Sequence, residues 1–435
     1  MNLFQYYINQ FSNLKNEPYQ ERGVLPTEAF AFMSYCKAMK VDTIIESGTA
    51  FGQSCYLFAK YLDIEVHTVD NISHYGHTAQ NIAKERCKDL PVHFHEGDST
   101  ILIPNLLESF KNNKVAIFID GPKGSLAKKF RTNLFNYQNV YIAALHDSVG
   151  DNSIGKFSSA NHPEFLNTYR EFLDSESLKH PYPDSPSMTL GERFKEGMGM
   201  DLWYKPRNVM YYVYTGGVEE LYNDFIKTSK ELNDPYYMAL TAPNVNLHAD
   251  FITYFTEEEK GGTMGPKLNA LRRLPFLEGD KVFVTDIDLY FNQNIFDIFN
   301  ENFDIGVTSR NKTSGTAAQY SPINAGVWCF KYGDTTKKIF DWWYNQLTSP
   351  SYLEWIDYKK NHPYSKTIGL REWWVDQDLL NITYSNSKEL QISVKDIGPE
   401  FNWVVTDEEF LQFKDNKYKV LHRKTGTDSR WKIAK

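Results

Sequence analysis

Two aspartates one residue apart, Asp286 and Asp288, follow the apolar residues 282–285. An apolar run of this length predicts a buried strand, and alternate residues of a strand point to the same side, so both carboxylates are expected to face one cation. Carboxylate oxygens are ligands that Mg²⁺ and Mn²⁺ prefer. An ion held there would neutralise the charge of a departing diphosphate, so the pair predicts a metal site for diphosphate chemistry.

Further polar segments surround this pair in the chain. They are Gly265-Pro266-Lys267 upstream and, downstream, Asn324-Ala325-Gly326, Asp376-Gln377-Asp378, Phe401-Asn402-Trp403 and His422-Arg423-Lys424-Thr425-Gly426. In this order they resemble the GT-A glycosyltransferases, most closely the retaining group of glycogenin and the bacterial galactosyltransferases. The ordered set covers most of residues 207–435, which makes it far more specific than an aspartate pair alone.

The resemblance implies that Asp286, Asp288 and His422 hold Mn²⁺ or Mg²⁺, with His422 as a neutral imidazole. It also implies a nucleotide-sugar donor, with uridine favoured as the base. The other matching residues are implied to lie around that donor: Lys267 at the donor, Asn324 and Ala325 at the sugar, Asp376 and Gln377 at the reacting face, and Gly426 and Arg430 at the diphosphate. Arg430 stands, at altered spacing, where the family has a lysine.

Alternatives stay open at this end of the chain. Asp376 and Gln377 favour retention, in which the leaving phosphate takes the proton of the acceptor, but an inverting reaction with a carboxylate base is also possible. Taken singly, His422 is equally well a surface histidine and residues 324–326 an ordinary turn. A domain that binds carbohydrate without transferring it is a further alternative, and the presence of both aspartates and the histidine disfavours it.

The first half of the chain alternates strand-like and helical stretches. The strand-like stretches are residues 43–45, 66–69, 92–94, 115–119 and 140–144, and residues 197–204 are expected to close the same sheet. This rhythm predicts a parallel α/β sheet with helices on both faces. Ligands of such sheets bind beyond the carboxyl ends of the strands, so the residues that follow each stretch are candidates for a site.

The first of these strand ends carries Glu46, Gly48 and Gly52, and the second ends in Asp70. A nicotinamide-binding loop would need a glycine where Ala50 stands. The pattern instead resembles motif I of the class I methyltransferases that use S-adenosylmethionine. In that family the glycine loop packs on the methionine part of the cofactor and the acid of the second strand holds the ribose.

Asp98, after the third strand, stands where the family contacts the adenine. The alternative for Glu46, Asp70 and Asp98 is that they only cap the helices that follow the strands, since acids are favoured at N-caps. The combination of these strand-end acids with the glycine loop favours a nucleoside-type cofactor.

Asp120 and Asp147 follow the fourth and fifth strands and are candidates to share a divalent cation. This arrangement resembles small-molecule O-methyltransferases in which Mg²⁺ holds vicinal hydroxyls of the substrate. Lys123 stands at the spacing of that family's general base, and a nearby metal would lower its pKa as a base requires. His146 is the competing base.

The length, charge and composition of the chain limit the class of protein to which it can belong. The 435 residues, 41% of them hydrophobic, exceed one hydrophobic core, and we place a first domain at residues 1–206 and a second at 207–435. The formal net charge of −8 lacks the basic footprint of a nucleic-acid binder. No apolar run of about 18 residues occurs, which predicts no membrane span and a cytoplasmic protein. The four scattered cysteines are expected to be reduced.

The sequence therefore predicts an α/β protein in which a Rossmann-like class I methyltransferase sheet precedes a GT-A domain. The favoured function is transfer of a sugar to a glycan acceptor together with S-adenosylmethionine-dependent O-methylation of a sugar hydroxyl. The alternative function keeps the sugar transfer and makes the first domain a non-catalytic module that binds the acceptor.

Overall fold

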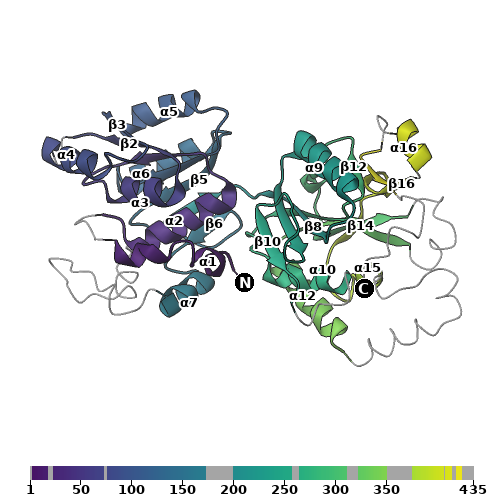
Figure 1. Cartoon of the computed structure of the whole chain (residues 1–435). Coiled ribbons are helices and arrows are strands. Elements are labelled where there is room, and N and C mark those ends of the chain that lie inside the picture. Colours follow the sequence, from purple (N-terminus) through teal and green to yellow (C-terminus); the bar gives the residue numbers. More distant parts are fainter. Residues whose placement is uncertain are drawn as a thin grey trace, which may run out of the picture. The chain divides into compact units, whose positions relative to one another are not determined.

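The computed structural model describes residues 2–17, 23–72, 76–172, 199–256, 264–310, 322–349, 375–405, 407–413 and 418–423. The chain divides into two compact units, Met1–Lys205 and Pro206–Lys435 (Figure 1). Two of the predicted donor-binding residues, Gly426 and Arg430, lie outside the described residues.

Seven strands form one sheet in the N-terminal unit, in the order β3-β2-β1-β4-β5-β7-β6. The strands are β1 (Thr43–Ser47), β2 (Glu65–Asp70), β3 (Val92–Glu96), β4 (Val115–Ile119), β5 (Val140–Leu145), β6 (Lys156–Ser158) and β7 (Asp201–Tyr204). β1 to β5 are parallel, as predicted, whereas β7 runs antiparallel to both β5 and β6. The sheet is therefore mixed, and its five parallel strands end at one common edge.

Helices cover both faces of this sheet (Figure 1). They are α1 (Leu3–Tyr7), α2 (Pro26–Met39), α3 (Gln53–Leu62), α4 (Gly76–Arg86), α5 (Ser99–Ser109), α6 (Gly124–Phe135) and α7 (Pro163–Phe172). On one face, Phe118 of β4 packs against Phe32 of α2 and Phe58 of α3, with ring centroids 5.2 Å away in both cases. On the other face, Ile117 of β4 belongs to a core that includes Leu134 of α6. Alternate residues of a strand face opposite ways, so a continuously apolar strand is buried on both sides.

The C-terminal unit has its own seven-stranded sheet, in the order β10-β9-β8-β11-β14-β13-β15, and a three-stranded sheet, in the order β12-β17-β16. The larger sheet contains β8 (Asn208–Tyr214), β9 (Tyr236–Thr241), β10 (Phe251–Tyr254), β11 (Lys281–Thr285), β13 (Ile305–Ser309), β14 (Ile323–Lys331) and β15 (Val394–Asp396). The smaller contains β12 (Leu289–Phe291), β16 (Trp403–Val405) and β17 (Val420–Arg423). The strand predicted before Asp286 is present as β11, and β8 to β11 pair in parallel.

The helices of this unit are α9 (Glu219–Asn233), α10 (Met264–Ala270), α12 (Asp334–Leu347), α15 (Val375–Ser385) and α16 (Asp407–Phe413). Aromatic side chains fill both faces of the larger sheet. Tyr212 of β8 packs on Phe225 of α9, with ring centroids 5.3 Å apart, and Trp328 of β14 packs on Trp343 of α12 at 5.5 Å. The high aromatic content of the chain is thus used mainly in the core.

The small sheet determines where the end of the described chain lies. β12 begins one residue after Asp288 and pairs antiparallel with β17, so that Leu289 is opposite His422. The backbone N–H of Arg423 donates to the carbonyl oxygen of Asp288 at 2.8 Å. Residues more than a hundred positions apart in the sequence therefore meet at the end of β11.

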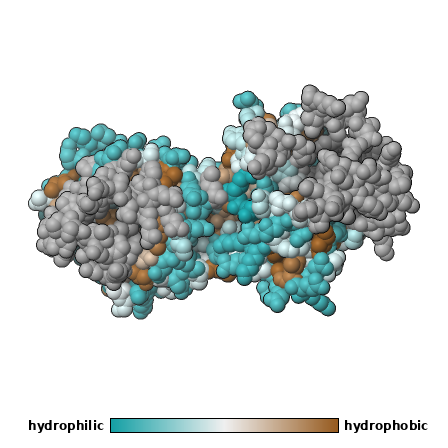
Figure 2. All heavy atoms as spheres, turned by 90° about the horizontal axis from the view of Figure 1, so that it is seen from below, coloured by the Kyte–Doolittle hydropathy of each residue, from teal (hydrophilic) through white to brown (hydrophobic). Residues whose placement is uncertain are grey.

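Within the described residues, no helix is both long and apolar enough to cross a membrane. On the face drawn in Figure 2, hydrophilic residues predominate and hydrophobic residues form small separate patches over the residues that are coloured. All four cysteines are free and buried, as expected for reduced thiols in a core.

A buried ion pair stabilises the start of the C-terminal unit. Asp280, which is fully buried, accepts from the guanidinium of Arg207 through both carboxylate oxygens and from the backbone N–H of Leu277. Replacing Asp280 by Ala leaves the guanidinium buried without its charge partner, so we expect a loss of about 3–5 kcal/mol in the free energy of unfolding. Urea unfolding followed by tryptophan fluorescence measures this loss.

The matched control is Asp341→Ala. Asp341 pairs with Arg272 at 2.9 Å on the surface, where the two side chains are largely exposed. Exposed pairs contribute little, so the unfolding midpoint of this variant should stay close to that of the wild type. Equal midpoints for the two variants would show that the buried pair does not stabilise the unit.

Candidate functional sites

The aspartate pair lies at the carboxyl end of β11. The backbone N–H of Asp286 donates to the carbonyl oxygen of Gly326 at 2.8 Å, which holds the residue beside β14. Gly326 permits a close approach, because a Cβ there would lie 2.6 Å from Cε1 of His422 and 3.2 Å from Oδ2 of Asp286. Asp288 lies 3.0 Å, through Oδ1, from Nε2 of His422. The two carboxylates and the imidazole are therefore together, with ligand atoms within 4.8 Å of one another.

A chain of hydrogen bonds fixes the tautomer of His422. The hydroxyl of Thr308 donates to the backbone carbonyls of Asn324 and Val327 at 2.8 and 2.7 Å, so its oxygen accepts from the side-chain amide nitrogen of Asn402 at 3.1 Å. The amide oxygen of Asn402 lies 2.8 Å from Nδ1 of His422 and accepts its proton. Nδ1 of His422 therefore carries a proton, and Nε2 is the ring nitrogen that faces the two carboxylates.

Nε2 of His422 is buried and has no hydrogen-bond partner within the described residues, although Asp288 is near. An imidazole nitrogen beside two carboxylates is satisfied either by a proton of its own or by a cation held among the three groups. Its other nitrogen donates to Asn402, which is how ligating histidines are commonly oriented. The donor set of two carboxylates and a neutral imidazole thus fits a divalent cation.

Lys267 and Asp376 line the same region. Nζ of Lys267 is buried 2.9 Å from Oδ1 of Asp286 and 3.8 Å from Oδ2 of Asp376. Burial lowers the pKa of Lys267, but the two carboxylates more than offset this, so its pKa is raised and it is an ammonium. Burial raises the pKa of Asp376 to about 7, against the opposing effect of Lys267.

The other predicted donor-binding residues are held by the backbone and by a neighbouring arginine. Asn324 accepts from the backbone N–H of Gly326 at 3.1 Å, and Ala325 is buried in β14. Gln377 accepts through Oε1 from the guanidinium of Arg310 at 2.7 Å. Asn324, Gln377 and Arg310 are therefore oriented by contacts within the unit.

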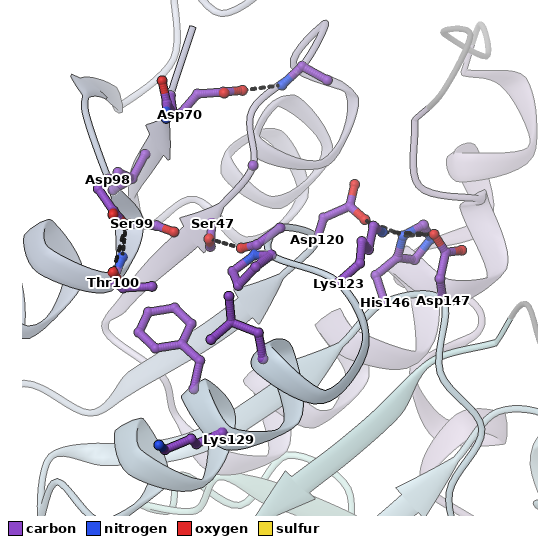
Figure 3. Close-up of a pocket in the computed structure, with 18 of the residues that line it drawn as sticks. Ser47, Asp70, Asp98, Ser99, Thr100, Asp120, Lys123, Lys129, His146 and Asp147 are labelled. Atoms are coloured by element: carbon purple, nitrogen blue, oxygen red, sulfur yellow. Dashed lines mark hydrogen bonds and ion pairs between the residues drawn. The ribbon is translucent and has the colours of Figure 1, made fainter. Parts of the chain in front are cut away.

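In the N-terminal unit a cavity of about 850 Å³ opens at the carboxyl ends of the parallel strands. Its polar lining includes Ser47, Asp70, Asp98, Ser99, Thr100, Asp120, Lys123, Lys129, His146 and Asp147. In Figure 3, Asp70 and Asp98 lie toward one end and Lys123, His146 and Asp147 toward the other, with Ser47 between. The cavity thus joins the predicted cofactor residues to the predicted acid–base residues.

Asp70 fixes the glycine loop. Its Oδ2 accepts from the backbone N–H groups of Thr49 and Ala50, both at 2.8 Å. Gly48 has φ +97°, and a Cβ there would lie 3.2 Å from the backbone nitrogen of Gly121, so this position favours glycine. Asp70 therefore caps the loop across the sheet rather than the helix that follows its own strand.

Two further predicted cofactor residues have structural contacts. Gly52, with φ +76°, allows α3 to pack on α4, because a Cβ there would lie 2.8 Å from Cβ of Ala83. Asp98 is the N-cap of α5 and accepts from the backbone N–H of Thr100 at 2.8 Å, a hydrogen bond that lowers its pKa together with that from the Thr100 hydroxyl. Capping by Asp98 is thus present alongside its place in the cavity wall.

Glu46 is buried and is absent from the cavity lining. Its carboxyl group hydrogen-bonds with the hydroxyls of Ser54 and Thr68, the latter at 2.7 Å. Burial raises the pKa of Glu46 to about 8, although the two hydroxyls act in the opposite direction. Glu46 therefore links β1 to Ser54 of α3 and Thr68 of β2 and does not line the cavity.

The acid–base residues form an ion-pair network. Lys123 contacts Asp120 and lies 2.8 Å from Oδ2 of Asp147. His146 lies between Asp120, 2.7 Å from Nδ1, and Glu28 of α2, 3.1 Å from Nε2. The network thus combines three carboxylates with two cations.

These contacts change the acidity of both candidate bases. Burial lowers the pKa of His146, but Asp120 and Glu28 more than offset it, so the pKa is raised well above its usual value. The pKa of Lys123 is likewise raised, because Asp120 and Asp147 outweigh burial. The ammonium of Lys123 lies between the two carboxylates, in the position predicted for a cation, whereas both nitrogens of His146 are already engaged.

Comparison with known proteins places these sites in a family context. Residues 225–395, from α9 to β15, match the model of the family described as nucleotide-diphospho-sugar transferase. A nucleotide-diphospho-sugar transferase domain lies in the C-terminal unit. The match includes Lys267, Asp286 and Asp288, while Asn402 and His422 lie beyond its end. No curated protein matches the sequence of the chain.

Three solved structures illustrate the structural similarity. Mouse xyloside xylosyltransferase 1 is 10% identical, covering 52% of this chain and 98% of its own, with a TM-score of 0.31. A putative O-methyltransferase from Klebsiella pneumoniae is 17% identical, covering 47% and 90%, with a TM-score of 0.27. The O-methyltransferase TomG from Streptomyces achromogenes, solved with S-adenosylmethionine, is 15% identical, covering 45% and 88%, at 0.26. The predicted fold class, a methyltransferase-like half before a GT-A-like half, is confirmed.

Sequence reasoning missed several residues around the transferase domain's aspartates and around the cavity. Asn402 was in a segment that resembles the family, but nothing in the sequence connected it to His422. Thr308 lies within β13, Arg310 follows that strand, and Glu28 lies on a helix that precedes the first strand of its sheet. Each contacts the site through packing between distant elements, for which a single sequence carries no signal.

Glu46 gives the N-terminal unit a predictable pH dependence. In the unfolded chain a glutamate loses its proton near pH 4.3, whereas in the folded protein Glu46 keeps it until about pH 8. Stability from this group is therefore complete below the unfolded pKa and is lost as the pH rises toward 8, by up to about 1.4 kcal/mol per pH unit. Relative to Glu46→Gln, the wild type should lose stability between pH 5 and 8 in urea unfolding.

The control is Glu96→Gln, which changes an exposed carboxylate at the end of β3. Its stability profile should run parallel to that of the wild type over the same range. A Glu46→Gln profile that also ran parallel would contradict the assignment of a protonated carboxyl to Glu46.

Proposed function

We propose that the chain transfers a sugar from a nucleotide-sugar donor to a glycan acceptor and methylates a sugar hydroxyl with S-adenosylmethionine. The observation that carries the sugar transfer is the buried Nε2 of His422, which lacks a hydrogen-bond partner among the described residues and faces Asp286 and Asp288. The family match of the surrounding domain supplies the class of donor.

Asp286, Asp288 and His422 would hold Mn²⁺ or Mg²⁺, and such an ion would supply the positive charge that a departing diphosphate needs. Lys267, held as an ammonium beside Asp286, adds a second positive charge near the same place. Asp376 and Gln377 lie at the start of α15 and would face the reacting side of the sugar. We favour a uridine diphosphate sugar and retention of configuration, from the resemblance of these segments to the glycogenin group.

The cavity of the N-terminal unit is proposed to hold S-adenosylmethionine. Its volume and its position at the strand ends suit a nucleoside-type ligand. Gly48 would approach the methionine part, Asp70 the ribose and Asp98 the adenine. The methyl group would then lie toward the ion-pair network, where Lys123 is the proposed base and His146 the competing one.

Lys123 becomes a base only when its carboxylate partners are neutralised in another way. A divalent cation on Asp120 and Asp147 would replace the ammonium, and the pKa of Lys123 would fall once it lost both partners. The sugar hydroxyl then donates its proton to the amine of Lys123 while its oxygen takes the methyl group. His146, already paired with Glu28 and Asp120, would remain a positioning residue.

The second candidate is a non-catalytic N-terminal module that binds the acceptor. The observation that favours it is the same network, because both candidate bases are held protonated by carboxylates. In that case the sugar transfer is the only reaction of the chain, and the cavity contributes affinity for the acceptor.

Metal-dependent hydrolysis of the donor tests the sugar transfer. With Mn²⁺ and a panel of nucleotide sugars, we expect Asp288→Asn to lower the hydrolysis rate by about 100-fold or more, because the charge on the leaving diphosphate is no longer neutralised. Asn402→Ala leaves the three ligands in place and releases the orientation of His422, so it should raise the Mn²⁺ concentration for half-maximal rate by about 10–100-fold.

The control is Asp341→Asn, which removes a surface carboxylate of the same unit and should leave both the rate and the Mn²⁺ dependence unchanged. A wild type that hydrolyses no donor with any ion would reject the sugar transfer. An Asn402→Ala variant with unchanged Mn²⁺ dependence would show that His422 is not a metal ligand. The role of the aspartates would then be decided by Asp288→Asn.

Methyl transfer is tested with S-adenosylmethionine labelled in its methyl group and the glycan product of the C-terminal domain. Lys123→Met removes the proposed base, so labelling should fall by about 100-fold or more while sugar transfer stays normal. Lys128→Met, an exposed lysine of α6 that is absent from the cavity lining, is the matched control and should label normally.

Treatment with EDTA followed by Mg²⁺ or Mn²⁺ separates the two candidate roles of the cavity. Loss and recovery of labelling would support a cation on Asp120 and Asp147. If the wild type labels no sugar while glycosylating normally, the non-catalytic module is the better description.

A further inference from the structure

A cluster of imidazoles lies on β2 and β3, away from the cavity. Glu65 and His67 begin β2, and His93 and His95 lie on β3, the edge strand of the sheet. In the parallel register His67 is opposite His93, so the four side chains point to one face. The cavity opens at the carboxyl ends of these strands, whereas Glu65, His67 and His93 lie toward their amino ends.

The cluster is in close contact. Oε1 of Glu65 lies 2.8 Å from Nε2 of His93 and 3.3 Å from Nε2 of His67. The ring of His67 stacks between those of His93 and His95, with centroids at 4.6 and 5.2 Å and interplanar angles of 19° and 20°. Nδ1 of His67 is 3.0 Å from Nε2 of His95. Three ligand atoms, one each from Glu65, His67 and His93, lie within 4.8 Å of one another.

His67 carries an unsatisfied atom at the centre of this group. The residue is 7% exposed, and its Nε2 has no hydrogen-bond partner in the described part of the chain. Oε1 of Glu65 lies 3.3 Å from this nitrogen. A buried polar atom without a partner is unfavourable, and a ligand placed between Glu65 and the two imidazoles would satisfy it.

We propose that Glu65, His67 and His93 bind a divalent transition-metal ion of the zinc class. Two imidazoles and a carboxylate are a ligand set that zinc accepts, with a fourth position left to water or another ligand. Ligand atoms about 2.05 Å from a tetrahedral ion are about 3.4 Å apart, and the Glu65–His67 separation of 3.3 Å already matches this. Nε2 of His93 lies 2.8 Å from the same oxygen, and because His93 is half exposed its ring can turn toward a shared ion.

The hydrogen-bond pattern agrees with this ligand set. When Nε2 of His67 binds a metal, its proton is on Nδ1 and is donated to Nε2 of His95. His95 is then a positioning residue for His67.

An ion at this position joins the edge strand to its neighbour. β3 pairs only with β2 within the described sheet, so its other edge has no strand beside it. A metal link between His93 on β3 and the two ligands on β2 would stabilise this edge without contributing to methyl transfer. The site therefore stands apart from the proposed function, and its test needs no enzyme activity.

Zinc and cobalt titrations of the full-length, EDTA-treated protein test the site. The double variant Glu65→Gln/His93→Ala changes two half-exposed side chains, so the fold should persist, which unfolding without metal verifies. We expect the wild type to bind one more equivalent of Zn²⁺ than this variant, with at least about 100-fold tighter affinity at that site. Bound Co²⁺ should give visible absorption bands that the double variant lacks.

Two further variants complete the design. His77→Ala removes an exposed histidine of α4 and should leave stoichiometry and affinity unchanged. His95→Ala should keep the stoichiometry and weaken zinc binding by about 10–100-fold. Equal zinc stoichiometry and affinity in the double variant and the wild type would overturn the proposal, as would a wild type in which Zn²⁺ binds only weakly at all positions.

Discussion

The arrangement of the C-terminal unit depends on one contact at the end of β11, where two carboxylates and an imidazole lie close together. Asp286, Asp288 and Nε2 of His422 face one another, and the ammonium of Lys267 lies beside Asp286. The protein maintains this convergence through contacts on the other side of the imidazole. The hydrogen bonds from Thr308 through Asn402 hold the imidazole, while the pairing of β12 with β17 brings His422 to the aspartates. Groups held together at a cost in stability are typical of ligand-binding and catalytic sites.

The N-terminal unit meets a related problem with a different solution. Asp120 and Asp147 also converge at strand ends, but Lys123 lies between them and His146 bridges Asp120 to Glu28. The charges are largely compensated within the protein, so the cavity is stable without an added ion. Similar acids at similar strand ends therefore differ in how they are compensated: Lys267 pairs with Asp286 and leaves Asp288 facing His422, whereas Lys123 pairs with both Asp120 and Asp147.

What the sequence predicted follows from local rules. Apolar stretches of the sequence predicted β1 to β5 and β11, and the acids that follow these strands identified the sheet edges where ligands bind. The antiparallel direction of β7 and the small sheet that places His422 depend on long-range pairing, which local patterns do not contain. For the same reason Glu28, Thr308 and Arg310 were not foreseen, and Glu46, expected at the ligand, turned out to be absent from the cavity lining because it points to Ser54 and Thr68.

The two-residue period of a strand directs Glu65 and His67 of β2 to one side of the sheet. Asp286 and Asp288 lie instead in the bend between β11 and β12 and meet His422 through the pairing of β12 with β17. Carboxyl ends are usual places for ligands because loops and helix N-termini meet there, whereas residues near amino ends normally serve packing. Packing alone does not account for three stacked imidazoles, a carboxylate and an unsatisfied Nε2 on β2 and β3. A shared ion explains the unsatisfied Nε2 and the nearby carboxylate, and it would link β3, the edge strand of the described sheet, to β2.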